Sequence, residues 1–403
     1  MKSLVYCREW FLGRGSYGRV FEAVDKDTGQ VVAVKISRVS ARVWRSVLRH
    51  EARLLQLVQG HPSVPEMIGY LRIPHFEYLA MELLGESLRQ KIRGQQSLQH
   101  GTVARIGEQM LSALVHIASH GVVHRDIKPD NILLSLTDSS RVVLIDFGIA
   151  HYLPAVKDLT NAREHGLKFR FPTGSLPWCS VRAHQDLPPL PQDDLESLAY
   201  VLLRLSLGRG GLPWQIPKEP HLSLSVDEAV WAIYAAKRSL TRRLLPVTVA
   251  DEIADLLEIC KEEDCTTEAY ILKLSTLSSH MRQYALALGE RDGDPLNWSF
   301  KPQLMRPPSL AKASSSSTQG SEPNPSEEPP FNLTAHLGGL CDNERYTNSY
   351  FYPDIALWDV VHGRRSSLTL PPHEEEMLDD EVPQLEDVDL VHEMDDDVKR
   401  FKV

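Results

Sequence analysis

The stretch His124-Arg125-Asp126-Ile127-Lys128-Pro129-Asp130-Asn131 decides how the rest of this 403-residue chain is interpreted. It combines a carboxylate, an ammonium group and a carboxamide at short, fixed spacings. Asp126 is suited to orient or accept the proton of a hydroxyl group, and Lys128 places a positive charge beside a group that gains negative charge. Asn131 supplies an oxygen of the kind that magnesium binds. We therefore interpret this stretch as a catalytic loop.

A second metal-binding candidate follows within twenty residues. Asp146-Phe147-Gly148 comes directly after the apolar run 142–145, which is typical of a short strand. A carboxylate held at the end of such a strand can chelate the metal ion that bridges the phosphates of a nucleotide. We expect Asp146 and Asn131 to be the metal-binding residues.

A glycine-rich segment, Gly13-Arg14-Gly15-Ser16-Tyr17-Gly18-Arg19-Val20, precedes both motifs. Glycines at Gly13, Gly15 and Gly18 allow backbone N–H groups to close over a polyphosphate, which side chains would obstruct. The same spacing opens dinucleotide-binding folds, where a helix follows it. Here another strand-like run follows instead, which disfavours the dinucleotide interpretation.

The next strand-like run ends in Val32-Ala33-Val34-Lys35. A lysine at this place can reach the phosphates of a nucleotide, provided that a carboxylate holds it. Glu51, on a helix predicted over 43–59, is the first candidate partner, and Glu66 is the alternative. The four motifs occur in one order along the chain, and chance does not account for that combination.

The pattern of apolar residues predicts an α+β fold in two lobes. Residues 8–84 are mostly strand-like, with runs at 11–12, 20–24, 31–36 and 78–81 and a hairpin turn at 27–29. From Gly85 onward helices dominate, and we predict them over 100–120, 194–207, 247–259 and 270–288. Two short strands, 132–134 and 142–145, are predicted after the catalytic loop.

Residues 8–290 resemble a eukaryotic protein kinase domain, and more narrowly the casein kinase 1 family of serine/threonine kinases. The narrower resemblance rests on Met81-Glu82-Leu83-Leu84-Gly85-Glu86-Ser87-Leu88, on Asp193-Asp194-Leu195-Glu196-Ser197-Leu198-Ala199-Tyr200 and on Leu212-Pro213-Trp214. That family lacks the usual Ala-Pro-Glu motif, and here Ser180-Val181-Arg182 stands in its place.

The resemblance implies transfer of the γ-phosphate of ATP, with magnesium, to serine or threonine hydroxyls of protein substrates. It implies a small sheet-and-helix lobe over a larger helical one, with ATP between them. The roles it assigns are a gatekeeper (Met81), backbone contacts to adenine (Glu82, Leu84), an anchor for the catalytic loop (Asp194) and a serine in place of a threonine (Ser175). The nucleotide-binding set is completed by Val20 and Ala33, and Lys128 is similar to the serine/threonine class rather than the tyrosine class.

The chain departs from that family at one place. Casein kinase 1 enzymes carry a basic pair just before the Asp-Asp-Leu-Glu-Ser stretch, which receives a phosphate on prephosphorylated substrates. Pro191 and Gln192 stand there instead. We therefore expect little preference for prephosphorylated substrates, unless Arg182 or Arg170 takes over the phosphate.

Charge separates the chain into a domain and a tail. The formal net charge is −10, and residues 374–397 carry 13 acidic and no basic residues, which leaves +3 elsewhere. The near-neutral domain gives no case for nucleic-acid binding. Residues 291–330 are predicted to be a Pro/Ser-rich linker and 331–403 a largely disordered acidic tail. We expect a monomer with intramolecular tail contacts.

The sequence also bears on where the protein works. We find no secretory signal at the start and no apolar run long enough to span a bilayer, so we expect a cytoplasmic or nuclear protein without membrane contacts. The five cysteines are scattered, which is typical of reduced thiols.

Two other functions compete with that of an active protein kinase. A pseudokinase scaffold would usually lack Lys35, Asp126 or Asp146, all of which are present. A small-molecule phosphotransferase with a kinase-like fold is disfavoured by the complete glycine-rich segment.

Overall fold

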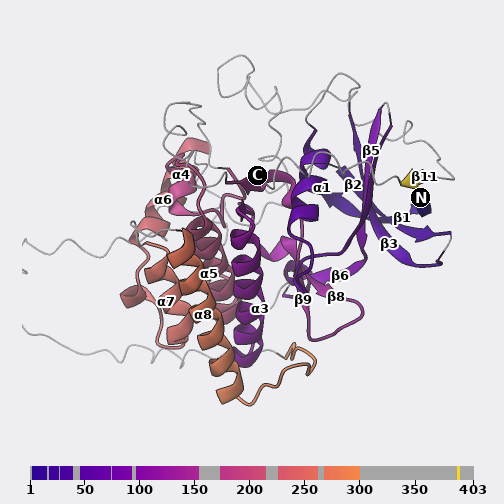
Figure 1. Ribbon diagram of the computed structural model, residues 1–403. Helices are drawn as coiled ribbons and strands as arrows, with labels where there is room; N and C mark the ends of the chain where they lie inside the picture. Colours follow the sequence, from indigo (N-terminus) through magenta and orange to yellow (C-terminus); the bar gives the residue numbers. More distant parts are fainter. Residues whose placement is uncertain are drawn as a thin grey trace, which may run out of the picture.

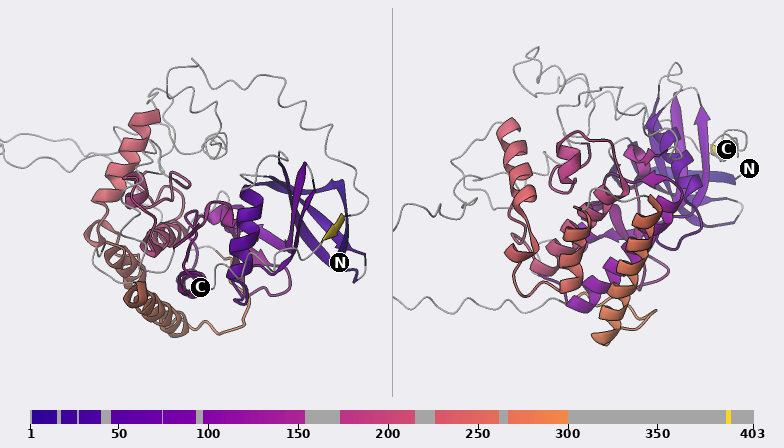
Figure 2. Two further views of the ribbon diagram at one scale, coloured as in Figure 1. Left: turned by 45° about the horizontal axis from the view of Figure 1, so that its top comes forward. Right: turned by 60° about the vertical axis from the view of Figure 1, so that its left-hand side comes forward.

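The computed structural model describes residues 2–15, 18–26, 28–39, 46–73, 75–92, 97–153, 173–214, 226–261, 267–299 and 388–390. Strands dominate the first part of the chain and helices the rest, as predicted for an α+β, two-lobed fold (Figure 1). Figure 2 shows the sheet on one side of the molecule and the long helices on the other. Within the described residues no helix has the length and apolar character needed to cross a membrane.

The small lobe is an antiparallel sheet with the strand order β11-β1-β2-β3-β5-β4. Its strands are β1 (Lys2–Gly15), β2 (Gly18–Asp25), β3 (Val31–Arg38), β4 (Met67–Ile73) and β5 (Phe76–Glu82), with the tail strand β11 (Val388–Leu390). Helix α1 (Val47–Leu57) lies against β4 and β5. Neither β4 nor β11 was predicted.

Alternation along β3 explains how the small lobe positions its lysine. Val32, Val34 and Ile36 point to one face of the sheet, where they join a cluster with β1, β2, β4 and β5. Ala33 points to the other face and packs with residues of α1. Because side chains alternate along a strand, Lys35 lies on the same face as Ala33 and points toward α1.

The large lobe has one hydrophobic core, built around α3 and α5. Its helices are α2 (Leu88–Lys91), α3 (His100–Ser119), α4 (Val181–His184), α5 (Pro191–Leu207), α6 (Val226–Ser239), α7 (Asp251–Ile259) and α8 (Thr267–Ala287). Strand β6 (Leu84–Ser87) precedes α2, and short strands and turns lie between α3 and α4: β7 (Val122–Val123), η1 (Pro129–Asn131), β8 (Ile132–Ser135), β9 (Val142–Leu144), η2 (Phe147–Ile149) and β10 (His151–Tyr152). The turn η4 (Arg242–Leu244) follows α6.

Four predicted helix starts were wrong. Helix α8 begins at Thr267, three residues before the predicted 270. Helix α1 begins at Val47 rather than 43, since Ser46 caps it by accepting from the Arg49 N–H; residues 40–45 lie outside the described part. Helix α5 begins three residues early, at Pro191, because proline needs no donor there and Asp193 accepts from the Leu190 N–H at 2.7 Å. Helix α7 begins four residues late, because Val247 is fully exposed in a turn.

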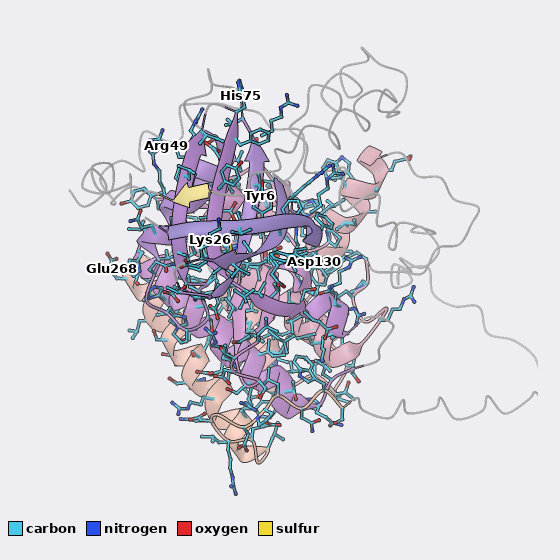
Figure 3. All side chains as sticks on the ribbon, turned by 90° about the vertical axis from the view of Figure 1, so that its right-hand side faces the viewer. Tyr6, Lys26, Arg49, His75, Asp130 and Glu268 are labelled. Atoms are coloured by element: carbon cyan, nitrogen blue, oxygen red, sulfur yellow. The ribbon has the colours of Figure 1, made fainter. Side chains whose placement is uncertain are left out.

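The predicted linker and tail are described only in part. Residues 291–299 lie against α3, where Arg105 donates to the backbone oxygens of Asp294 and Pro295. In the tail, β11 pairs antiparallel with Lys2–Leu4, the outer end of β1, and also contacts β4. Figure 3 views the molecule from the side of the sheet, with the short yellow β11 among its strands. Residues 300–387 and 391–403 lie outside the described part.

Candidate active site

The first group of charged side chains centres on Lys35. Its Nζ lies 2.8 Å from Glu51 Oε2, on α1, and 2.8 Å from Asp146 Oδ1, just after β9. All three groups are largely buried. Glu66, the alternative partner, has an exposed side chain, and its backbone oxygen accepts from the Glu82 N–H at 2.9 Å. The structure therefore places Glu51, and not Glu66, beside the lysine.

Burial and charge compete in this group. Burial disfavours the ammonium of Lys35, but the charges of Asp146 and Glu51 outweigh it and raise its pKa above the ordinary value. Burial likewise disfavours ionised Asp146, and the charge and hydrogen bond of Lys35 outweigh it and lower its pKa. For Glu51 burial wins and raises the pKa to about 7. One cation shared by two carboxylates leaves the group short of positive charge when both are ionised.

The backbone turns sharply at Asp146. Asp146 adopts a left-handed conformation with φ of +69°, and the turn η2 follows. Phe147 is buried in the large core, and its ring contacts that of His124 edge-on at 4.8 Å. His124 Nε2 bonds to the Ile145 oxygen at 3.0 Å, and burial lowers the pKa of its ring. His124 therefore acts as a neutral structural link between the two motifs.

The second group centres on Asp126, whose two oxygens are both engaged. Oδ1 accepts from the hydroxyl of Ser175 at 2.8 Å and from its backbone N–H at 3.2 Å. Oδ2 accepts from Lys128 Nζ at 2.7 Å and from Asn131 Nδ2 at 2.9 Å. Lys128 Nζ also donates to Ser175 Oγ at 3.0 Å. The four side chains form one connected polar network.

Asp194 binds the backbone at the start of the catalytic loop. Its carboxylate accepts from the N–H of His124 at 2.6 Å and from that of Arg125 at 2.7 Å. These bonds fix Arg125 in a left-handed conformation with φ of +71°. Burial raises the pKa of Asp194 to about 7, although the two N–H bonds oppose this rise. The resemblance to casein kinase 1 assigned Asp194 the anchoring role that this geometry fits.

Gly174 is a site residue that the sequence analysis missed. A Cβ atom there would lie 2.5 Å from the Arg125 backbone oxygen, and its φ is +98°. Only glycine fits this position without strain, and the close approach brings the next residue, Ser175, onto Asp126. The sequence shows a glycine before Ser175-Leu176-Pro177, but no local pattern predicts the contact between this glycine and the Arg125 backbone oxygen.

The glycine-rich segment forms the hairpin between β1 and β2. Gly13 pairs with Val20 and Gly15 with Gly18, while residues 16 and 17 lie outside the described part. A Cβ on Gly18 would lie 2.4 Å from the Ile36 oxygen, whereas one on Gly13 would meet nothing within 4 Å. Gly18 thus allows close packing on β3, and Gly13 borders open space, as a phosphate-covering turn requires.

The predicted adenine-binding side chains gather in one apolar cluster. Val20, Ala33 and Met81 pack together there, with Leu83 beside them. The Glu82 carboxylate is ion-paired with Arg141, which turns it away, and Leu84 pairs with Ser135 at the start of β6. An apolar site of this kind suits a flat heteroaromatic ring.

The metal candidates lie on adjacent backbone. The Asn131 oxygen accepts from the Ile145 N–H at 2.9 Å, directly before Asp146. Asn131 Nδ2 donates to the backbone oxygen and to Oδ2 of Asp126, both at 2.9 Å, so its amide oxygen is the atom suited to a cation. Among the residues described, no group of three or more His, Cys, Asp or Glu could hold a metal ion. Two hard oxygen ligands fit magnesium, which completes its shell with phosphate and water.

A comparison with protein families agrees with this geometry. The family model described as protein kinase domain matches residues 6–267, which is more than half of the chain. All four motifs and both groups of charged side chains lie within the matched region.

Proposed function

The chain belongs to the protein kinase family, and we propose that it is an active serine/threonine kinase similar to the casein kinase 1 family. Protein kinase domains use ATP and magnesium and act on proteins. The observation that carries the proposal is the completeness of the network around Asp126, with Lys128, Asn131 and Ser175 in contact with one carboxylate. A pseudokinase has no need to keep this network.

The residues divide the work of phosphotransfer. When bound, ATP supplies the phosphoryl group and magnesium neutralises charge on its phosphates. Lys35, held by Glu51, orients the phosphates, and Asn131 and Asp146 hold the metal. Asp126 orients the hydroxyl of the substrate and receives its proton, while Lys128 stabilises the negative charge that develops beside it.

Preference for serine and threonine follows from Lys128. Its ammonium lies between Asp126 and Ser175, at 2.7 and 3.0 Å. A lysine at this place fills the space near the catalytic carboxylate and favours a short aliphatic hydroxyl over a tyrosine ring. This supports the resemblance to serine/threonine kinases.

The likeness to casein kinase 1 is supported by how the substrate-side loop is held. Ser180 stands where other kinases carry Ala-Pro-Glu, and its hydroxyl donates to Asp193 at 2.8 Å. The Val181 N–H donates to Glu196 at 3.1 Å, and Trp214 Nε1 donates to the Pro177 oxygen at 2.9 Å. Two of the three segments that carry the resemblance, 193–200 and 212–214, therefore contact the same loop.

We expect no strong preference for prephosphorylated substrates. Pro191 and Gln192 are buried in the first turn of α5, so this position offers no exposed cation. Arg182 is ion-paired with Asp193 at 3.3 Å and donates to the Pro188 oxygen at 3.0 Å. Arg170 lies outside the described residues.

The test is phosphate incorporation by the full-length protein. Radiolabelled ATP should transfer its γ-phosphate to casein and to serine peptides, with phosphoserine and phosphothreonine as products. Thermal stabilisation by ATP should require magnesium. Nucleotide binding without incorporation into any protein or peptide would support the pseudokinase alternative and overturn the proposal.

A further inference from the structure

Lys237, on α6, is one of the most deeply buried charged side chains in the large lobe. Its side chain is only 1% exposed. Its Nζ donates to the backbone oxygens of Leu176 at 2.8 Å and Cys179 at 2.6 Å, and lies 3.3 Å from His184 Nε2. An ammonium group has three donors, and these three acceptors can use all of them, with the Cys179 Sγ a further, weaker acceptor at 3.8 Å.

Burial lowers the pKa of Lys237, and the charges of Cys179 and Glu196 oppose that shift. In the described part of the chain, no carboxylate lies within ion-pair distance of Nζ, so Glu196 acts on it only through its longer-range charge. The rings of Tyr200 and Trp214 lie 5.3 and 5.5 Å from Nζ. An ammonium buried without such acceptors and ring faces would be strongly unfavourable.

The ring of His184 is neutral beside the Lys237 ammonium. Burial and the charge of Lys237 lower the pKa of His184 to about 2, so its ring is neutral. A neutral ring whose Nε2 accepts from Nζ carries its proton on Nδ1. His184 is therefore a third acceptor for Lys237 and not a second cation in the pocket.

The two carbonyls that Lys237 binds belong to the loop that contacts the catalytic aspartate. The turn Ser175–Cys179 is closed by bonds from the N–H groups of Trp178 and Cys179 to the Ser175 oxygen, at 2.8 and 2.9 Å. Ser175 itself bonds to Asp126 at 2.8 Å. Lys237 thus binds the Leu176 and Cys179 carbonyls of a turn whose first residue, Ser175, contacts the catalytic aspartate.

We propose that Lys237 is a positioning residue for transfer to peptides, which fixes the loop 175–180 so that Ser175 stays on Asp126 and the acceptor peptide meets an ordered surface. This inference rests on the proposed kinase activity. Lys237 touches no reacting group, so its removal should affect the peptide side of the reaction more than the nucleotide side.

The decisive variant is Lys237→Met in the full-length protein, with Lys261→Met as the matched control. Lys261 also donates to a backbone oxygen, that of Leu240 at 2.7 Å, but it is an exposed residue and, in the described part of the chain, makes no hydrogen bond to the loop. For Lys237→Met we expect kcat/KM for a serine peptide to fall at least about tenfold, because small misplacements of reacting groups slow a reaction by such factors or more. Hydrolysis of ATP without peptide should change less than about twofold, and the control should match the wild type in both assays.

Each outcome decides the question. Equal peptide activity in Lys237→Met and wild type, or a parallel loss of peptide transfer and ATP hydrolysis, would overturn the positioning role. A wild-type protein that phosphorylates no peptide would instead sink the proposed function itself. If Lys237→Met does not fold, two variants of His184 test the proposal instead. His184→Leu removes an acceptor of Nζ and should lose peptide phosphorylation but keep ATP hydrolysis. His184→Gln keeps an acceptor at this place and should retain both activities. Unchanged activity in both would overturn the inference.

Discussion

The two charged groups of the active site are built in opposite ways. In the group around Lys35, one cation is shared by two carboxylates, Glu51 and Asp146, at 2.8 Å each. In the group around Asp126, one carboxylate is shared by three side-chain donors, from Lys128, Asn131 and Ser175. The first group has more negative than positive charge, and the second has its carboxylate fully satisfied.

This difference matches the partners that each group is proposed to meet. A group that lacks positive charge gains from a divalent cation, which the phosphates of a nucleotide bring with them. A carboxylate that is already held by fixed donors needs little rearrangement when a hydroxyl arrives, which is the property of a preorganised site. The first group also joins the two lobes, whereas the second lies wholly within the large lobe.

The sharpest way to separate the groups is to neutralise one carboxylate in each. Asp126→Asn should lower kcat for peptide phosphorylation by at least about a hundredfold, because an amide cannot take up the proton of the hydroxyl. It should leave the magnesium-dependent thermal stabilisation by ATP intact. Asp146→Asn should lose both phosphotransfer and that stabilisation, because the metal ligand is gone.

Phosphate incorporation and thermal unfolding with ATP, with and without magnesium, check both variants. If Asp126→Asn kept more than about a tenth of wild-type kcat, the activation barrier would have risen by less than roughly 1.4 kcal/mol, and this would contradict the role of the carboxylate. Identical nucleotide responses of the two variants would remove the distinction between the groups.

The second test concerns the partner of Lys35. Lys35→Met should cripple turnover, and Glu51→Gln should lower kcat/KM about tenfold, since the lysine then loses its anchor on α1. Glu66→Gln is the matched control, because its exposed side chain does not face the lysine. Steady-state kinetics with varied ATP measure the effect. Loss of activity in Glu66→Gln equal to that in Glu51→Gln would contradict the geometry.

The Lys35 group shows how far sequence reasoning reached. Strand alternation and helix spacing are local properties, so they predicted β3 and located Lys35 on it, and they gave Glu51 as the first candidate on the helix that follows. They left Glu66 open, because the direction in which a helix faces a sheet depends on packing across the lobe. The catalytic loop was easier still, since Asp126, Lys128 and Asn131 lie within six residues.

Long-range packing explains what the sequence did not show. Lys237 meets the loop at Leu176 across 61 residues of sequence, and its helix, α6, was not predicted. Gly174 is required by the Arg125 oxygen, a contact between two loops. The Arg141–Glu82 ion pair likewise joins a turn to the end of β5. None of these contacts has a periodic pattern in the sequence, so only the folded chain shows them.

The anchoring carboxylate of Asp194 should affect a different property, the pH dependence of stability. Its pKa is about 7 in the folded chain and 3.8 for an ordinary carboxyl, so the folded protein binds this proton more tightly than the unfolded chain does. Ionisation therefore costs folded-state stability as the pH rises from about 4 to about 7, and the cost is constant above that. In Asp194→Asn this contribution is absent.

The difference in unfolding free energy between wild type and Asp194→Asn should accordingly shift against the wild type by up to about 4 kcal/mol over this range, since a change of one in pKa corresponds to about 1.4 kcal/mol. Urea unfolding of both proteins at pH 4, 5, 6, 7 and 8 measures it, and the contributions of all other groups largely cancel in the difference. A difference that does not vary with pH would show that Asp194 is ionised throughout.

The last prediction asks how far the position of the Asp126 carboxylate depends on the hydroxyl of Ser175. Ser175 Oγ donates to Asp126 at 2.8 Å and accepts from Lys128 at 3.0 Å, while the Ser175 N–H gives Asp126 a second bond at 3.2 Å. Ser175→Ala removes the two hydroxyl bonds and keeps the backbone bond. We expect kcat to fall about tenfold, since a hydrogen bond to a charged group contributes roughly 1.5–3 kcal/mol and the remaining donors compensate in part.

Ser175→Thr restores the hydroxyl with one added methyl group and should stay within about threefold of wild type, because both bonds can form again. Measuring kcat and peptide KM separately distinguishes the two ways in which the serine acts. If the hydroxyl only orders Asp126 and Lys128, kcat changes and the peptide KM does not, whereas a direct contact with the substrate would raise KM. Wild-type kcat in Ser175→Ala would mean that Lys128, Asn131 and the backbone N–H of Ser175 are enough to hold the catalytic carboxylate. The Asp126 group would then tolerate the loss of one donor, whereas the Lys35 group has only one cation for its two carboxylates.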